Sequence, residues 1–434
     1  MERSRPHVLL IHCHDLGDLI GCYPDNSAQT PHLDRMAEEG ALFTQYFACA
    51  PQCSPSRAGM YTGLHPNRNG LQGLAHIGPW NLNPALPTLP KVMKEVGYWS
   101  AQVGVFHIGS DPKLYDFEAS MRLSHCEEVA EAALHILEDR PTDRPFFAVV
   151  GFFEPHRPYT ATWPHLQDPV KLLVPPYLVD CPAGREELSR FYGEVSRVDA
   201  AVGRLLEWLQ EQALDDETLV IFTTDHGIAM PLAKGTLYDP GLKIALLMRW
   251  PGVIPAGRRV ERLLSNVDLF PSILDAVEAE DCTPAGLDGR SFWPCVVGGL
   301  CEPRQQVFAE ITWHDYYQPM RCIRTATHKL IRNFEPGIGL QVPGDVLASP
   351  FTAANREALR SWPRPEYELY DLTTDPLERH NLAGDPAVAT IEALLKGRLQ
   401  ARLEWAQDPI LRGPVEPPPG YREALAARHG GLPA

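Results

Sequence analysis

The chain has 434 residues, a length that predicts roughly two or three domains and excludes a single small module. Hydrophobic residues make up 44% and charged residues 22%, as in average soluble globular proteins, so a wholly disordered chain is excluded. The formal net charge is −16, and an acidic surface of that size repels phosphate backbones and anionic lipid. We therefore expect neither nucleic acid nor a membrane as a partner.

No apolar run approaches the roughly 20 residues that span a bilayer, and the longest, Phe146 to Phe153, has the length of a strand. The N-terminal segment has a basic start but only a short apolar stretch and no small-residue cleavage site. We read no signal peptide and expect a cytoplasmic protein. The ten cysteines are too sparse for a disulfide scaffold and show no zinc-ligand spacing, which predicts free thiols in a reducing compartment.

Up to about residue 303, short apolar runs alternate with amphipathic segments. Residues 7–13 form a continuous apolar run typical of a buried parallel strand, and a helix over 30–40 follows, with Thr30 at its N-cap. The alternation continues with helices over 86–97, 127–139, 186–209 and 271–277, and with strands over 98–104, 146–153, 218–224 and 244–250. This pattern predicts an α/β domain over residues 1–303, built on a doubly wound, mostly parallel sheet.

Beyond residue 303 the pattern changes to alternating runs without crossover helices, over 305–313, 320–334 and 367–373. Such runs predict an antiparallel sheet in a smaller C-terminal α+β domain, residues 304–434. A helix over 386–407 closes this domain. The Pro-rich tail from Asp408 is expected to be a surface strap outside the core.

The most specific motif runs from Cys53 to Arg57 (CSPSR) and is followed by Thr62-Gly63. It resembles the signature of the sulfatases, in which the cysteine is oxidised after synthesis to formylglycine. The resemblance implies an alkaline-phosphatase-like fold, a formylglycine-generating enzyme as maturation partner, and a hydrated aldehyde at position 53 as the nucleophile. A helix that begins near Pro55 would point its first backbone N–H groups at a sulfate or sulfamate. Arg57, in the first turn of that helix, would donate a pair of hydrogen bonds to the same oxygens.

The family takes the ligands of one divalent cation from two strand ends, and both strand ends exist here. His14-Asp15 follows the first strand, where the family usually has two aspartates, and Asp225-His226 follows the strand over 218–224. The resemblance implies that Asp15, Asp225 and His226, with the modified Cys53, hold the metal, and that the metal is calcium. Because calcium prefers oxygen and imidazole suits zinc or manganese, it stays open whether His14 ligates and which of these ions binds.

Three more positions resemble the family's sulfate and leaving-group contacts. His107, in GVFHIG, matches the residue that touches the formylglycine hydroxyl and acts as base for collapse of the sulfo-enzyme. His156, in FFEPHRPY, matches the proton donor to the leaving group, and Lys234 matches a basic residue of the sulfate pocket. Val105 stands where the family usually has Lys, so the resemblance implies that this pocket lacks one cation.

Within the sulfatases, the phrases NRNGLQGL and GTLYDPG and the stretch from Trp313 to Arg321 are similar to the sulfamidase (N-sulfoglucosamine sulfohydrolase) subgroup. The resemblance implies hydrolysis of a sulfate ester or sulfamate on a short sulfated mono- or oligosaccharide, as in heparan sulfate degradation. Four residues either line a sugar subsite or pack between the domains: Trp80, Trp313, His314 and Tyr316.

Two other functions stay open. One is a phosphodiesterase or phosphonate monoester hydrolase of the same superfamily, which the loss of the usual Lys at Val105 favours. The other is a non-catalytic protein that binds sulfated sugars and keeps Cys53 as an unmodified thiol. The sequence leaves open whether the protein forms an oligomer.

Overall fold

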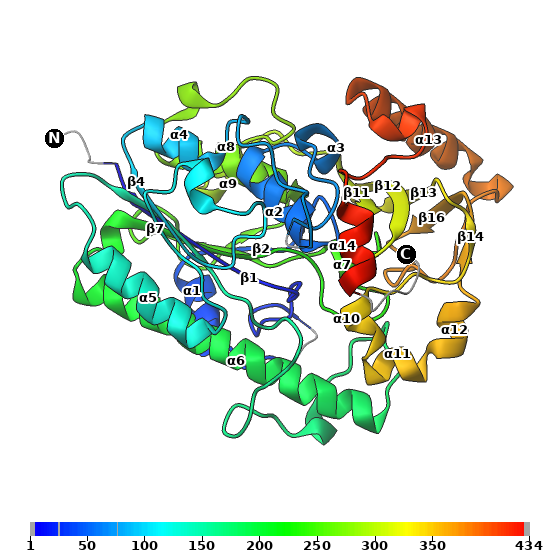
Figure 1. Cartoon of the computed structure of the whole chain (residues 1–434), viewed down its shortest axis with the longest axis horizontal. Coiled ribbons are helices and arrows are strands. Elements are labelled where there is room, and N and C mark those ends of the chain that lie inside the picture. The colour runs from blue at the N-terminus through cyan, green and yellow to red at the C-terminus, as the bar shows by residue number, and fades with distance from the viewer. Residues whose placement is uncertain (1–4, 25–26, 76, 429–434) are drawn as a thin grey trace.

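Two β-sheets organise the chain in the computed structural model, which describes residues 5–24, 27–75 and 77–428 (Figure 1). The large sheet has the strand order β5-β4-β6-β1-β7-β8-β2-β9. Its strands are β1 (His7–Cys13), β2 (Ala41–Phe43), β4 (Trp99–Gly104), β5 (Ala119–Met121), β6 (Phe146–Gly151), β7 (Thr218–Thr224), β8 (Leu246–Arg249) and β9 (Arg258–Val260). The strands from β5 to β7 in this order are parallel, whereas β8 is antiparallel to both neighbours. The predicted mostly parallel sheet is confirmed.

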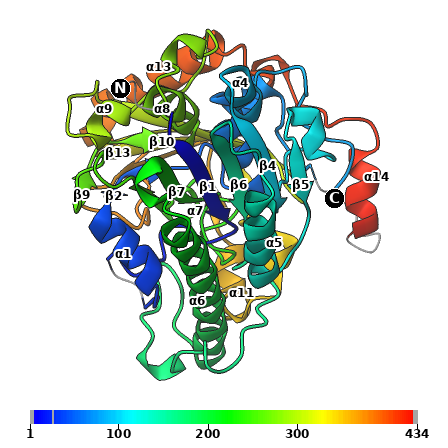
Figure 2. The ribbon, with the colours of Figure 1, turned by 90° about the vertical axis from the view of Figure 1, so that its left-hand side faces the viewer.

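Helices cover both faces of this sheet, which explains why its central strands are continuous apolar runs (Figures 1 and 2). One face carries α1 (Pro31–Glu39), α5 (Cys126–Glu138) and α6 (Pro182–Glu211); the other carries α2 (Cys53–Thr62), α4 (Leu89–Glu95) and α8 (Leu269–Ala276). Along α6 the apolar residues that recur every three or four positions are all fully buried: Leu188, Phe191, Val195, Val198, Val202, Leu205 and Leu209. Among the described residues, no helix combines the length and apolar character needed to cross a membrane.

The small sheet is antiparallel, as predicted, and consists of β11 (Gln306–Trp313), β12 (Tyr317–Thr325), β13 (His328–Asn333) and β16 (Tyr367–Asp371). One face packs against α13 (Ala389–Trp405), and the other packs against Phe47 and residues 237–242 beside the large sheet. The short elements are β3 (Tyr46–Phe47), β10 (Leu264–Ser265), β14 (Gly337–Ile338), β15 (Pro363–Arg364), α3 (Pro66–Asn69), α7 (Asp239–Leu242), α9 (Trp293–Val296), α10 (Gly344–Leu347), α11 (Pro350–Ala354) and α12 (Arg356–Arg360).

The C-terminal tail contributes to the core, so the prediction of a surface strap is wrong at its start, where Asp408 and Ile410 are buried, and in its last part. After the Pro-rich segment, residues 421–428 form α14 (Tyr421–Arg428), and both Tyr421 and Leu425 are fully buried. The Tyr421 hydroxyl accepts a hydrogen bond from the Leu74 backbone N–H at 3.0 Å. The prolines dominate the composition of the tail and obscured an apolar pair spaced four residues apart, which faces one side of a helix.

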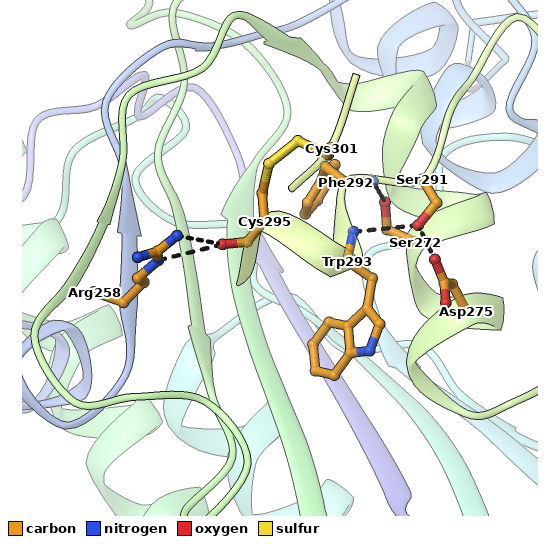
Figure 3. The surroundings of a disulfide bond; sticks show 8 residues. All are labelled: Arg258, Ser272, Asp275, Ser291, Phe292, Trp293, Cys295 and Cys301. Carbon is orange, nitrogen blue, oxygen red and sulfur yellow. Dashed lines mark hydrogen bonds between the residues drawn. A yellow bond between two sulfur atoms is a disulfide. The ribbon is translucent and has the colours of Figure 1, made fainter. Parts of the chain in front are cut away.

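The prediction of free thiols is wrong for one pair, because Cys295 and Cys301 form a disulfide (Figure 3). Cys295 lies in α9, and the chain turns back through Gly298 so that the two Cα atoms are 5.4 Å apart. A pair six residues apart matches neither a zinc spacing nor a dense scaffold, so the sequence carried no signal for it.

Candidate functional site

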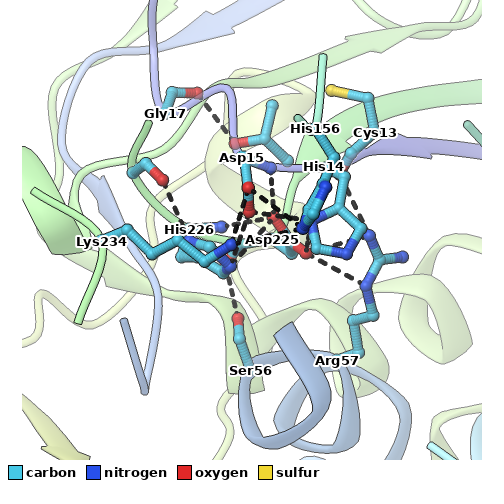
Figure 4. A network of polar contacts seen from close by, with 12 residues as sticks. Cys13, His14, Asp15, Gly17, Ser56, Arg57, His156, Asp225, His226 and Lys234 are labelled. Atoms are coloured by element: carbon cyan, nitrogen blue, oxygen red, sulfur yellow. Dashed lines mark hydrogen bonds and ion pairs between the residues drawn. The ribbon is translucent and has the colours of Figure 1, made fainter. Parts of the chain in front are cut away.

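The carboxyl ends of β1 and β7 bring the predicted metal ligands together. The two strands pair in parallel register up to Cys13 and Thr224, so the loops that follow leave the same edge of the sheet. The Asp15 backbone N–H donates to Asp225 Oδ1 at 3.0 Å. The structure places the ligand atoms of four residues within 4.8 Å of one another (Figure 4): His14, Asp15, Asp225 and His226. We call these four residues the acid–histidine cluster.

The donor atoms of this cluster fit a divalent cation. His226 Nδ1 lies 2.9 Å from the Gly227 carbonyl oxygen, which only accepts, so Nδ1 carries a proton and Nε2 is the nitrogen that faces the cluster. That Nε2 is buried, lies 3.2 Å from Asp15 Oδ1 and makes no hydrogen bond. Burial lowers the pKa of His226, but the carboxylates of Asp225 and Asp15 outweigh it and raise that pKa, so the position of Nε2 attracts positive charge. A divalent cation there would take the place of a proton and bind both Nε2 and the carboxylate.

Two cations keep the carboxylates of the cluster ionised. Burial favours the neutral acids, but Lys234 and the neighbouring histidines hold the pKa of Asp15 well below its usual range. His226, His14 and Arg57 similarly hold the pKa of Asp225 low against the effect of burial. Lys234 Nζ donates to Asp15 Oδ2 at 2.7 Å, and Arg57 Nη2 donates to Asp225 Oδ2 at 2.9 Å. Arg57 therefore faces a cluster carboxylate, although the sequence led us to expect it to face the substrate.

Two more predicted histidines lie against this cluster. His107 Nδ1 is 3.2 Å from His14 Nε2, and His156 Nε2 is 3.5 Å from Lys234 Nζ. Burial lowers the pKa of His14 and of His156, which favours neutral rings. His107 and Asp15 have φ of 54° and 52°, a left-handed conformation that non-glycine residues adopt mainly where the surrounding structure enforces it, as at functional sites.

Cys53 lies beside the cluster, at the first residue of α2, two positions earlier than the predicted helix start near Pro55. Its Sγ and ring nitrogens of His14 and His107 lie within 4.8 Å of one another. The N-cap residue Gln52 makes no side-chain capping bond, so its side chain satisfies none of the N–H groups of the first turn. The structure thus brings all nine predicted site residues into one region.

Sequence reasoning missed Asp345, which reaches this region from α10. Lys234 Nζ donates to Asp345 Oδ2 at 2.7 Å, and His156 Nε2 lies 3.7 Å from the same oxygen. The Gly344 backbone N–H donates to Asp315 at 2.7 Å, which ties α10 to the turn between β11 and β12. Lys234 and Asp345 are 111 positions apart, and no motif or periodicity in the sequence connects them.

The aromatic residues proposed for a sugar subsite mostly pack with the tail instead. Trp80 and Trp313 are buried, and their ring centroids lie 5.1 and 6.2 Å from that of Tyr421. His314 is buried, and the hydroxyl of Tyr316 is buried as well. For Trp80 and Trp313 the structure therefore shows packing. Val105 follows β4 directly and is buried too.

The fold and the cluster define a hydrolase of the alkaline-phosphatase-like class. The family model "Sulfatase" matches residues 6–279, and the model "N-sulphoglucosamine sulphohydrolase, C-terminal" matches residues 229–337. Human N-sulphoglucosamine sulphohydrolase is 30% identical to this chain, and the alignment covers 95% of this chain and 93% of the human protein. The chain is therefore an enzyme of the sulfatase family.

Solved structures share the fold. BT4656 in complex with its substrate D-glucosamine-2-N,6-O-disulfate superposes with a TM-score of 0.75 at 20% identity, covering 93% of this chain and 99% of that one. The phosphonate monoester hydrolase SpPMH from Silicibacter pomeroyi superposes with a TM-score of 0.73 at 21% identity, covering 93% and 96%. At these identities the likeness shows the fold alone.

Proposed function

We propose that this enzyme hydrolyses the sulfamate, or a sulfate ester, of a short sulfated sugar, with N-sulfated glucosamine as the substrate. The observation that carries the proposal is the position of Cys53, which starts α2 against the acid–histidine cluster. The substrate follows the human relative, whose name gives N-sulphoglucosamine and which aligns over almost the whole chain.

In the proposed reaction, a separate enzyme first oxidises Cys53 to formylglycine, and water hydrates the aldehyde. One hydroxyl of the hydrate attacks sulfur and gives up its proton, the S–N bond breaks, and His156 relays a proton to the departing nitrogen, so the hydroxyl loses one proton and the amine gains one. His107 then takes the proton of the second hydroxyl, the C–O bond to the sulfate breaks, and the aldehyde returns. The net reaction consumes one water and releases the amine and sulfate.

Asp15, Asp225 and His226 would hold a divalent cation, with His14 as a fourth ligand. When bound, the cation supplies positive charge that holds the sulfate oxygens and lowers the pKa of the hydrate hydroxyl. Two carboxylates and two imidazoles suit zinc or manganese as well as calcium. Arg57 orients Asp225 through its hydrogen bonds, and Lys234 adds charge where the leaving group departs.

A phosphonate monoester or a phosphodiester is the second candidate substrate. The phosphonate monoester hydrolase SpPMH shares this fold, and buried Val105 leaves the anion pocket without the lysine that sulfatases usually have there.

The test is turnover by protein coexpressed with a formylglycine-generating enzyme. We expect the highest kcat/KM with N-sulfoglucosamine, a lower value with an aryl sulfate and the lowest with a phenylphosphonate monoester. Cys53→Ala should abolish all three activities. A phosphonate preference of roughly a hundredfold, equivalent to about 2.7 kcal/mol in the barrier, would overturn the proposal. The mass of the tryptic peptide around Cys53 reports whether the thiol has been converted, and an unconverted but active protein would refute its role.

A further inference from the structure

We propose that the enzyme has a second binding site, for a sulfated sugar, in a pocket of about 520 Å³ outside the acid–histidine cluster. The pocket lies between residues 287–290, the start of β11 and the last turns of α13, and its lining includes no residue of the cluster. Its volume falls in the range of about 300–1,000 Å³ that small-molecule sites occupy. The class of ligand rests on the proposed function.

The pocket concentrates positive charge on a chain whose net charge is −16. Its lining contains two carboxylates, Asp288 and Glu302, against four arginines: Arg290, Arg304, Arg398 and Arg402. A cavity with an excess of one sign of charge raises the local concentration of ions of the opposite sign. The lining therefore favours an anionic ligand.

The buried carboxylate is already occupied by other partners. Asp288 Oδ1 accepts from Arg68 and from Arg402, each at 3.0 Å, and Oδ2 accepts from the His65 backbone N–H at 2.8 Å. Arg402 still has Nη1 buried without a hydrogen bond. Arg304 is paired with Asp268, which lies outside the lining. The two arginines of the lining without a strong carboxylate partner are therefore Arg290 and Arg398.

Those two arginines have weak partners within the described chain. Arg290 lies 3.9 Å from Glu302, and both side chains are largely exposed. Arg398 makes one long hydrogen bond, of 3.4 Å, to the neutral amide of Gln306. Each guanidinium therefore keeps planar pairs of N–H donors for a sulfate or carboxylate group, which such a pair binds in a bidentate manner.

An aromatic wall favours a sugar over a bare oxyanion. Trp405 lines the pocket and is 59% exposed, and the Arg68 and Arg402 guanidinium carbons lie 4.5 and 4.7 Å from its ring centroid. Exposed indole surface beside guanidinium groups suits a ligand that carries both apolar ring faces and anionic substituents. Inorganic sulfate or phosphate would satisfy the arginines but would fill little of the volume.

The test is isothermal titration calorimetry of full-length Cys53→Ala protein, which cannot turn over the probe, a heparin-derived N-sulfated disaccharide. We expect two binding events. Arg290→Ala/Arg398→Ala should weaken one of them at least tenfold, and Lys234→Ala should weaken the other. Arg190→Ala/Arg412→Ala makes the same charge change at exposed positions outside the pocket lining and should keep both. Melting temperatures check that each variant is folded.

The outcomes separate the two proposals. If no binding event is sensitive to Lys234→Ala, the result counts against the proposed function. If no binding event is sensitive to Arg290→Ala/Arg398→Ala, the result counts against the second site alone. The unsulfated N-acetyl disaccharide and sodium sulfate are titrated as control ligands. If either binds the pocket as tightly as the sulfated disaccharide does, the pocket does not recognise a sulfated sugar.

Discussion

In the proposed active site Lys234 supplies positive charge for the sulfate group, and its ammonium group already has two carboxylate partners. It donates to Asp15 and to Asp345 at 2.7 Å each; burial alone would lower its pKa, but these carboxylates outweigh burial and raise it. When a metal holds Asp15, Asp345 remains as the negative charge nearest to the lysine. Because Val105 contributes no second cation, Asp345 should weaken the binding of sulfate.

We therefore predict that Asp345→Asn lowers the inhibition constant of inorganic sulfate. Removing one negative charge a few ångströms from the anion changes the interaction by about 1–2 kcal/mol at an intermediate effective dielectric, or roughly five- to thirtyfold. Competitive inhibition of aryl sulfate turnover measures the constant. Glu357→Gln, on exposed α12, should leave it unchanged. If sulfate binds more weakly to Asp345→Asn, then Asp345 matters for holding Lys234 in place and does not repel the anion.

We predict that His14 influences which metal the acid–histidine cluster prefers and that His14→Asp shifts the preference toward calcium. His14 Nδ1 lies 2.8 Å from Asp15 Oδ1 and 3.4 Å from Asp225 Oδ2, so an aspartate there adds an oxygen donor to the same point. Oxygen ligands favour calcium and imidazole favours zinc. After dialysis against equal calcium and zinc, elemental analysis should show a calcium-to-zinc ratio at least roughly tenfold above that of the wild type.

A matched control is His135→Asp, because His135 is 78% exposed on α5. Its metal content should equal that of the wild type. An unchanged ratio in folded His14→Asp protein would mean that position 14 does not contribute a ligand.

At the scale of elements, α14 is hydrogen-bonded to the loop that precedes Trp80. The Tyr421 hydroxyl accepts from Leu74 N–H at 3.0 Å, and the Ala75 N–H of the same loop donates to Ser54, next to Cys53. We predict that Tyr421→Phe lowers the melting temperature, because the buried Leu74 N–H loses its acceptor at a cost of about 1–3 kcal/mol. Scanning fluorimetry measures the shift. Glu423→Gln, exposed on the same helix, should melt like the wild type, and an unchanged Tyr421→Phe would show that water replaces the hydroxyl.

The elements that could be predicted from the sequence are those with local patterns. The apolar run of residues 7–13 and the periodicity of α6 record burial directly, and the CSPSR motif locates the start of α2 within two residues. The position of Asp345, the disulfide at Cys295 and the burial of Tyr421 depend on chain segments that meet only after folding. No local pattern in a single sequence shows that such distant positions are in contact.

At the scale of the whole molecule, a buried charge network joins the small sheet, α3 and the tail. Glu310, in β11, accepts from the Asn67 backbone N–H of α3 at 2.7 Å and lies 3.3 Å from Arg321 of β12. Arg321 donates to Asp408 at 2.7 Å, and Asn67 also donates to Asp408, at 2.8 Å. Burial, with a contribution from the negative charge of Asp408, raises the pKa of Glu310 to about 7, although Arg321 opposes this.

This shift predicts a specific dependence of stability on pH. A carboxyl whose folded-state pKa exceeds its unfolded value of 4.5 binds its proton more tightly in the folded protein. The resulting stabilisation is fully present below pH 4.5 and is lost as the pH rises through about 7.

Because glutamine cannot ionise, Glu310→Gln should gain stability relative to the wild type between pH 5 and pH 8, by an amount on the order of 3 kcal/mol for a shift of this size. Melting temperatures of both proteins across this range give the difference, in which the titration of groups common to both proteins cancels and any effect that does not depend on pH remains as a constant. Exposed Glu357→Gln should differ from the wild type by a constant amount. A constant difference for Glu310→Gln as well would mean that Arg321 keeps Glu310 ionised at every pH tested.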